Sequence, residues 1–133
     1  MAKSAKERLN SEKQSKKVVL DKNFAGIKAG QRMLVGTPKM IDRYIRKIPR
    51  GEVRTIHRLR NELARRNGCD ATCPVSTAIF IRISAEAALE ELQQGTDISD
   101  VAPFWRLIGP NDKITKKLNV DKEWIEIQRE MEQ

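Results

Sequence analysis

The chain has 133 residues, with 26 Lys and Arg, 18 Asp and Glu, and a formal net charge of +8. This length corresponds to one domain, and a hydrophobic share of 39% lies below that of most globular chains but above that of disordered ones. No apolar run approaches the roughly 20 residues that span a bilayer, the Lys-rich N-terminus has no signal-peptide pattern, and two cysteines make no disulfide framework. We therefore expect a soluble, intracellular, single-domain basic protein, cytoplasmic or nucleoid-associated, with no membrane partner.

Positive charge is concentrated in the first half of the chain. Residues 1–35 hold nine Lys and Arg against three acids, and residues 36–68 hold ten against three. Residues 69–133 hold seven against twelve, so a half with a net charge of +13 precedes one with −5. Such asymmetry favours a polyanion partner, although a solvated surface with a mobile basic tail would have the same composition.

The first 36 residues carry few signals of structure. After Met1, Leu9 is the only large apolar side chain in residues 1–17, so we expect a disordered basic tail there, because it buries too little surface to offset the entropy of ordering. Residues 18–36 are broken by glycines and are expected to form an irregular extension with at most a short strand or helix. The folded domain is expected at residues 37–133.

Three helices are predicted at the start of this domain, from the helical spacing of apolar residues and from residues that favour helix ends. They run from Thr37-Pro38 to Pro49, from Thr55 to Asn67-Gly68, and from about Pro74 to Gly95. The third begins with the run VSTAIFIRI, which is apolar on most sides and is expected to be central. The short link between the second and third helices makes them similar to a helix-turn-helix.

A hairpin and a last helix complete the predicted domain. Two strands, Trp105–Ile108 and Lys113–Leu118, are expected around a Gly-Pro-Asn-Asp turn, and Asp121 is expected to cap an amphipathic helix. The order of these elements predicts an α+β, mainly α fold: a winged helix-turn-helix with a small β-hairpin wing.

Catalytic and metal-binding chemistry has little support in the sequence. The one histidine, His57, lies among arginines and has no nucleophile or carboxylate constellation near it in the chain. Neither a Walker A sequence nor GxGxxG occurs, and Cys69 and Cys73 lack the further ligands that zinc requires. We expect a protein without enzymatic activity, metal or cofactor.

Arginines crowd the second predicted helix and its flanks, where phosphates would find cationic donors spread over one surface. The third helix begins with small side chains, which would let it approach either a groove floor or a neighbouring helix. We predict a DNA-binding surface formed by Arg50, Arg54, Thr55, Arg58, Arg65, Arg66, Cys73, Pro74, Ser76 and Thr77.

Three segments of the chain resemble the DNA-binding domain of the O6-alkylguanine-DNA alkyltransferases, also called methylated-DNA–protein-cysteine methyltransferases. The chain reads IPRGEVRTI, CPVSTAI and APFWRLIGPNDKI before an acidic final helix, where that family reads roughly IPxGxVxTY, RAVGxA and PCHRV. The resemblance covers residues 38–133. It implies that family's fold, with double-stranded DNA, plain or alkylated, as the partner of a monomer.

The chain departs from that family at its reactive positions. Phe104 stands where the family has its reactive cysteine, and Trp105 where it has the histidine that activates the thiol. Cys73 replaces the arginine that fills the gap left by the flipped base, and Ile56 replaces the tyrosine that helps to turn the nucleotide. This pattern is similar to the alkyltransferase-like proteins, which bind damaged DNA without repairing it and pass the lesion to other repair proteins. The resemblance implies a non-enzymatic DNA-binding protein with a repair protein as a second partner.

The pocket of that family would be lined here by Ile56, Phe104, Trp105 and Arg106. Two interpretations remain open for it: a site that holds an alkylated base by stacking, or a filled core. Two other functions also remain open. A transcriptional regulator would read the major groove, but the third helix lacks Arg, Asn or Gln near its start, where base edges are usually read. A protein–protein module would use the basic segment to bind an acidic partner.

Overall fold

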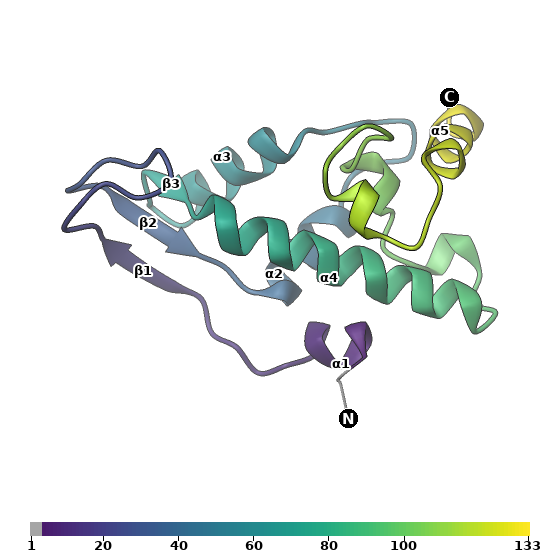
Figure 1. Ribbon diagram of the computed structural model, residues 1–133, viewed down its shortest axis with the longest axis horizontal. Coiled ribbons are helices and arrows are strands. Elements are labelled where there is room, and N and C mark those ends of the chain that lie inside the picture. The colour runs from purple at the N-terminus through teal and green to yellow at the C-terminus, as the bar shows by residue number, and fades with distance from the viewer. Residues whose placement is uncertain (1–3) are drawn as a thin grey trace.

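A long central helix organises the part of the chain that the computed structural model describes, residues 4–133 (Figure 1). This helix, α4 (Pro74–Gln93), is packed against α1 (Ala5–Leu9) and α2 (Pro38–Arg46). α3 (Ile56–Arg66) lies towards the N-terminal end of α4 in Figure 1, and α5 (Lys122–Met131) lies towards the other end, with the C-terminus. The helix that begins with the apolar run is therefore central, although Val75 and Ile79 of that run are exposed.

A three-stranded sheet lies at the end of the molecule where α4 begins (Figure 1). β1 (Lys16–Val19) pairs antiparallel with β2 (Arg32–Val35), and β2 pairs in parallel with β3 (Ala71–Thr72). Because β3 belongs to the link between α3 and α4, the sheet ties the N-terminal extension to the helix pair. The extension thus holds short strands, as the prediction allowed, but β1 begins at Lys16, inside the predicted disordered tail.

The helix ends follow the sequence signals. The hydroxyls of Thr37 and Thr55 each accept a hydrogen bond from a backbone N–H of the first turn of α2 and α3, at 3.1 Å and 3.0 Å. Gly68 and Gly95 follow the last turns of α3 and α4 with φ of +66° and +92°, a conformation that favours glycine. The predicted bounds of α3 and α4 are confirmed, whereas α2 ends at Arg46, three residues before the predicted stop at Pro49. The mixed α+β class is confirmed as well.

One core joins β2 to α2, α3, α4 and α5. Its fully buried members are mostly aliphatic, as the low aromatic content predicts: Leu34, Ile41, Ile45, Ile48, Leu59, Ile81, Phe104, Leu107, Ile108 and Ile125. Burial of each such side chain contributes about 1.5–3 kcal/mol of transfer free energy. In the described residues, no helix combines the length and the apolar character that crossing a membrane would require.

The N-terminal segment differs from the disordered tail that the sequence predicts. Ala5 and Leu9 are buried and pack against Ala87 of α4. The Glu90 carboxylate of α4 accepts hydrogen bonds from two backbone N–H groups in the first turn of α1, both at 3.1 Å. Two buried side chains four residues apart are too weak a pattern to reveal a five-residue helix in the sequence. The first three residues of the predicted tail lie outside the described residues.

The predicted β-hairpin wing is wrong. Its two expected strands form single 3₁₀ turns instead, at Phe104–Arg106 and Thr115–Lys117. Four of the five side chains from Phe104 to Ile108 are buried, so the segment lacks the alternation of a strand with one exposed face. The loop satisfies its polar groups locally: the Gly109 N–H donates to Asp112 at 2.7 Å, and the Thr115 hydroxyl donates to the Gly109 carbonyl at 2.6 Å.

Candidate nucleic-acid interface

Arginines and glutamates form a hydrogen-bonded network between α2 and α3. Glu62 accepts hydrogen bonds from Arg58 at 2.5 Å, from Arg66 at 3.2 Å and from the Tyr44 hydroxyl at 3.0 Å. The hydrogen bond from Arg58 is the main reason that the pKa of Glu62 is lowered. Glu62 therefore stays ionised and holds two guanidinium groups along one side of α3.

A second carboxylate extends this network towards the start of α3. Glu52 accepts hydrogen bonds from Arg54 at 2.8 Å and from Arg58 at 3.3 Å. The hydrogen bond from Arg54 lowers the pKa of Glu52, and the Arg54 guanidinium lies 5.5 Å from the centre of the Tyr44 ring. The network joins three arginines to two glutamates, which leaves one net positive charge.

The arginines predicted to bind phosphates therefore differ in their freedom to do so. Arg54, Arg58 and Arg66 belong to the network, whereas Arg50 donates only to the backbone carbonyl of residue 131, at 3.1 Å. Arg65 is exposed, and from Ser4 to Gln133 its side chain makes no ion pair or hydrogen bond. Among the five, Arg65 is the arginine best placed to bind a phosphate without giving up an existing contact.

At the start of α4, the side chains exposed to solvent are not the ones predicted to bind DNA. Cys73 and Thr77, both predicted to approach DNA, are buried, and the Thr77 hydroxyl donates to the Cys73 carbonyl at 2.6 Å. Cys73 belongs to a small buried cluster with Ile27 and with Met33 of β2. These two side chains point into the protein. Their predicted neighbours at the start of α4 are half-buried: Pro74 and Ser76.

The outward side of α4 carries an apolar stripe, which we define as Val75, Ala78 and Ile79. Val75 is 54% exposed and Ile79 is 53% exposed, and Ala78 lies half-buried between them. They are exposed because the opposite side of the same turns is anchored in the core by Thr77 and Ile81. Val75 and Ile79 are four residues apart and therefore lie on one side of the helix, opposite Thr77 and Ile81. This spacing is the sequence signal that could have predicted their exposure.

A groove of about 220 Å³ lies beside Ala78 and Ile79 of this stripe. Ile79, Arg82 and Glu86 of α4 line it, with Arg82 paired to Glu86, and Ile114 and Lys117 line it from the loop before α5. Arg8 of α1 lines it as well. Figure 1 shows this arrangement, with α1 on one side of α4 and the yellow-green loop on the other.

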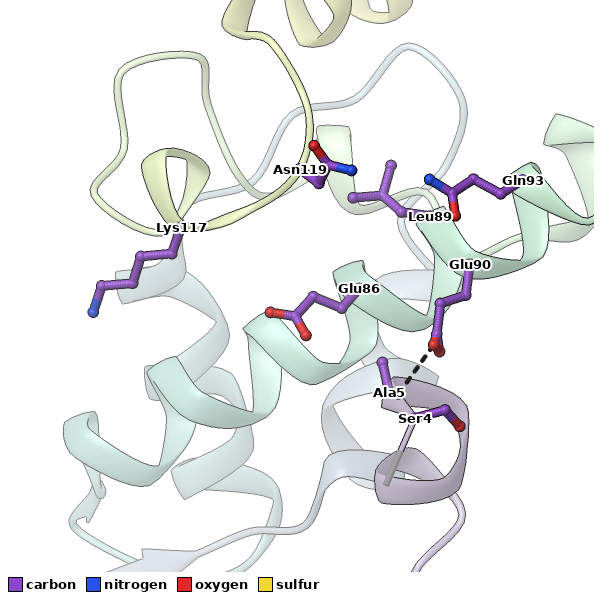
Figure 2. Close-up of a pocket in the computed structure, with 8 residues that line it drawn as sticks. All are labelled: Ser4, Ala5, Glu86, Leu89, Glu90, Gln93, Lys117 and Asn119. Atoms are coloured by element: carbon purple, nitrogen blue, oxygen red, sulfur yellow. Dashed lines mark hydrogen bonds between the residues drawn. The ribbon is translucent and has the colours of Figure 1, made fainter. Parts of the chain in front are cut away.

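A cavity of about 380 Å³ lies further along α4, between α1 and the two residues Lys117 and Asn119 (Figure 2). Figure 2 shows Glu86 and Glu90 projecting from α4, with Glu90 bonded to Ala5 and Lys117 on the far side. Two carboxylates in its wall make this cavity unsuitable for a polyanion. Glu86 and Lys117 line both this cavity and the groove beside the stripe, so the two hollows adjoin.

The predicted pocket residues Phe104 and Trp105 lie in the core, with 0% and 2% of their surfaces exposed. With Trp124 they form an aromatic cluster: Phe104 stacks on Trp124 with ring centres 5.7 Å apart, and Trp105 meets both rings edge to face at 5.4 Å and 5.7 Å. These rings fill the interior with each other. Neither Phe104 nor Trp105 lines a cavity in the described residues that a base could enter.

Glu132 fixes this segment from the end of α5. Its carboxylate accepts hydrogen bonds from the Trp105 indole at 2.9 Å and from Arg106 at 2.8 Å, and Arg106 also donates to the Ile48 carbonyl at 2.7 Å. Burial alone would raise the pKa of Glu132, but the hydrogen bonds from Arg106 and Trp105 outweigh it and lower the pKa. Arg106 is therefore a structural residue in this fold.

A smaller cavity of about 260 Å³ lies beside the start of α3. Of the four predicted pocket residues only Ile56 lines it, together with Leu107, Asp112 and Arg129. Burial lowers the pKa of Arg129, and the charge of Asp112 opposes that shift. The Arg129 Nε donates to the Trp105 carbonyl at 2.6 Å. Its two terminal nitrogens lie close to Gly109, which also lines this cavity.

The remaining candidates for chemistry are dispersed. His57 is exposed and lies 3.1 Å from the amide of Asn61, and Cys69 and Cys73 are free thiols. Within the described range, no group of three or more His, Cys, Asp and Glu side chains could hold a metal ion.

The comparisons with known proteins identify no relative. No protein-family model matches the chain, no curated protein matches it, and no solved structure matches it.

Proposed function

We propose that this protein binds double-stranded DNA without an enzymatic activity, through the α3–α4 pair used as a helix-turn-helix. The supporting observation is the juxtaposition of Arg65 and the arginine network on α3 with an exposed, uncharged stripe on α4. Cationic side chains bind phosphates and orient a protein on the duplex, while an adjacent helix whose outward side is uncharged can approach the bases. The β1–β2 pair would take the place of the wing.

The charge distribution supports a nucleic-acid partner of this surface. Residues 1–68 carry a net charge of +13 and residues 69–133 one of −5, and α3 belongs to the basic part. Such separation concentrates positive potential on one side and speeds encounter with a polyanion. The acidic part, which includes the second half of α4 and α5, would face away from the duplex.

The absence of a nucleophile at the aromatic segment supports a binding role. Phe104 and Trp105 supply neither a thiolate nor a base for alkyl transfer, and the resemblance to alkyltransferase-like proteins agrees with that. We propose that O6-methylguanine in the duplex is neither repaired nor strongly preferred, because the rings that would receive it pack on one another. Incubation with such DNA should leave the intact mass of the protein unchanged.

A transcriptional regulator is the second candidate, with a defined operator in place of general duplex affinity. It would need base-reading side chains on the outward side of α4, where Arg82 is the one long polar group near the stripe, and Arg82 is paired with Glu86. A protein–protein module is the third candidate, and it would bind an acidic polypeptide in place of DNA.

Titration of one duplex, with and without a single O6-methylguanine, at several salt concentrations tests the proposal. With about five phosphates neutralised, log K should fall with log[salt] with a slope of about −4 to −5. Unrelated sequences should bind within a factor of about ten of one another. A strong preference for one operator would favour the regulator, and no binding at low salt would contradict the proposal.

A further inference from the structure

We propose that the second half of α4 and the start of α5 bind a polypeptide segment of another protein, in which large apolar side chains stand between lysines or arginines. The site is a depression of the surface that we call the α4–α5 depression: the cavity of Figure 2 together with a second cavity beside it. None of its lining residues belongs to α3 or to the first half of α4. The inference therefore goes beyond the proposed function and concerns a surface that DNA binding would leave free.

Two adjoining cavities make up this depression. The second has a volume of about 350 Å³ and shares Leu89, Gln93 and Asn119 with the cavity of about 380 Å³. Cavities that hold ligands in proteins measure about 300–1,000 Å³, and each of the two reaches that size. Together they extend from α1 to Trp124 in the first turn of α5. A surface of this extent suits a chain segment with several side chains better than one compact small molecule.

The second cavity is mostly apolar. Its apolar side chains are each half-buried and pack against the edge of the main core: Leu89, Leu92, Val120 and Trp124. The Trp124 ring stacks on the buried ring of Phe104, with centres 5.7 Å apart, so its position is fixed before a ligand arrives. A fixed indole that is still partly open to solvent is the kind of side chain that dominates binding at protein interfaces.

Negative charge accompanies these apolar side chains. Residues 86–93 hold three glutamates and no Lys or Arg, and residues 119–126 hold three acids against one lysine. Glu90 accepts hydrogen bonds from backbone N–H groups of α1, which are neutral, so its charge stays uncompensated. Asp121 precedes α5 without a hydrogen bond from its side chain to the helix, and within residues 4–133 it makes no ion pair. These carboxylates attract lysine and arginine side chains and repel nucleic acid.

One lysine limits how a basic segment can lie in the depression. Lys117 is on the far side of the cavity in Figure 2, and among the described residues it is the one cation that lines either cavity. Glu86, which lines the same cavity, is already paired with Arg82. We therefore expect the basic side chains of the segment near Glu90 and near Asp121, with its apolar side chains between them.

A synthetic peptide of lysines and leucines, with the leucines spaced to form one side of a helix, is the probe that tests this site. The same peptide with serine in place of each leucine is its control. Because the protein has a net charge of +8, it repels a basic peptide as a whole, and binding requires a local concentration of acids.

The two indole N–H signals of the ¹⁵N-labelled protein report where the peptide binds. Trp124 lines the depression, whereas Trp105 is 2% exposed. We expect the Trp124 signal to shift as the leucine peptide is added, the Trp105 signal to shift much less, and the serine peptide to leave both almost unchanged.

Variants of the depression sharpen the test. Asp121→Asn and Glu90→Gln each remove one charge and keep a hydrogen-bonding side chain, and each should weaken peptide binding about two- to fivefold, the size of one exposed ion pair. Glu130→Gln, which alters an exposed carboxylate of α5 outside both cavities, is the matched control and should bind like the wild type. Leu92→Ala should weaken binding about tenfold, and the charge variants keep the test decisive if this truncation impairs folding.

Each failure has a separate signature. No shift of the Trp124 signal with the leucine peptide would overturn the proposal, and so would equal binding of the serine peptide or equal affinities of Asp121→Asn, Glu90→Gln and the wild type. A mass of the peptide-free protein that rises with concentration, together with the same Trp124 shift, would assign the depression to a second copy of the chain and overturn a separate partner. Duplex binding is measured without the peptide, so these outcomes leave the proposed function standing.

Discussion

Two pairs of apolar residues occupy opposite places in this protein. Phe104 and Trp105, the residues expected to line a pocket if one exists, are sealed in the core, whereas Val75 and Ile79, part of a run expected to be central, lie on the surface. Phe104 and Trp105 belong to a 3₁₀ turn that packs against α5. Val75 and Ile79 belong to α4, whose opposite side is buried. The contrast shows that apolar character alone does not say which side chains a fold encloses.

The difference arises from what each backbone segment can bury. A helix that is apolar on most sides must leave one side outward unless neighbours surround it, and α1, α2 and the aromatic segment cover only part of α4. The short aromatic turn lies under α5, and Glu132 satisfies the indole N–H that would otherwise prevent Trp105 from being buried. Exposure then marks Val75 and Ile79, not Trp105, as candidates for function.

The largest expected effect is that of Trp105→Ala. Loss of a buried indole and of its hydrogen bond to Glu132 should lower the free energy of unfolding by about 3–5 kcal/mol, measured by urea denaturation. Ile79→Ala, a truncation of an exposed side chain, should change it by less than about 0.5 kcal/mol. A Trp105→Ala protein as stable as the wild type would mean that the aromatic segment is not core.

Removal of the α1 contact should have a smaller effect. Leu9→Ala deletes a buried side chain at the edge of α4 and should cost about 2 kcal/mol, the low end for a buried leucine, with a lower Tm. Arg8→Ala, one residue away and exposed, is the matched control and should leave Tm unchanged while weakening DNA binding. If Leu9→Ala melts like the wild type, α1 does not stabilise the fold.

Acid should weaken the hydrogen bonds by which Glu132 holds Trp105 and Arg106 against the end of α5. Because the pKa of Glu132 is lowered in the folded protein, the stability that this group contributes is present above its unfolded pKa, about 4.3, and is lost as the pH falls through the folded pKa. Glu132→Gln should therefore be less stable than the wild type near neutral pH, with a difference that shrinks in acid. Urea midpoints measured across that range test this, and a constant difference would contradict it.

The smallest expected effects separate the arginines of α3. Arg65→Ala should flatten the salt dependence of DNA binding by about one unit of slope, as expected for one lost phosphate contact. Arg58→Ala should flatten it less, because Arg58 is already bonded to Glu52 and Glu62. Equal effects of the two substitutions would show that the network opens when DNA binds.

The sequence predicts the regular helices well and the rest of the fold poorly. Thr37, Thr55 and Gly68 mark helix ends through local backbone chemistry, which needs no knowledge of the tertiary structure. The strands of the sheet depend on pairing between residues 16–35 and 71–72, which are distant in sequence, and the aromatic turn depends on α5. Neither is visible in a local pattern.

The candidate site was predictable in charge but not in detail. The concentration of arginines near α3 follows from composition, yet which of them are free depends on Glu52 and Glu62, whose positions only the fold sets. Likewise, small residues at the start of α4 suggest close approach, but only the fold shows that Cys73 and Thr77 are buried.

An NMR titration of the ¹⁵N-labelled protein with a short duplex tests most directly the claim that the α3–α4 surface binds DNA. We predict that the amide signals of residues 75–82 and 113–117, together with those of Arg8 and Arg65, shift with increasing duplex, while those around Ile127 of α5 stay in place. Shifts confined to α5, or no shifts at low salt, would contradict the account.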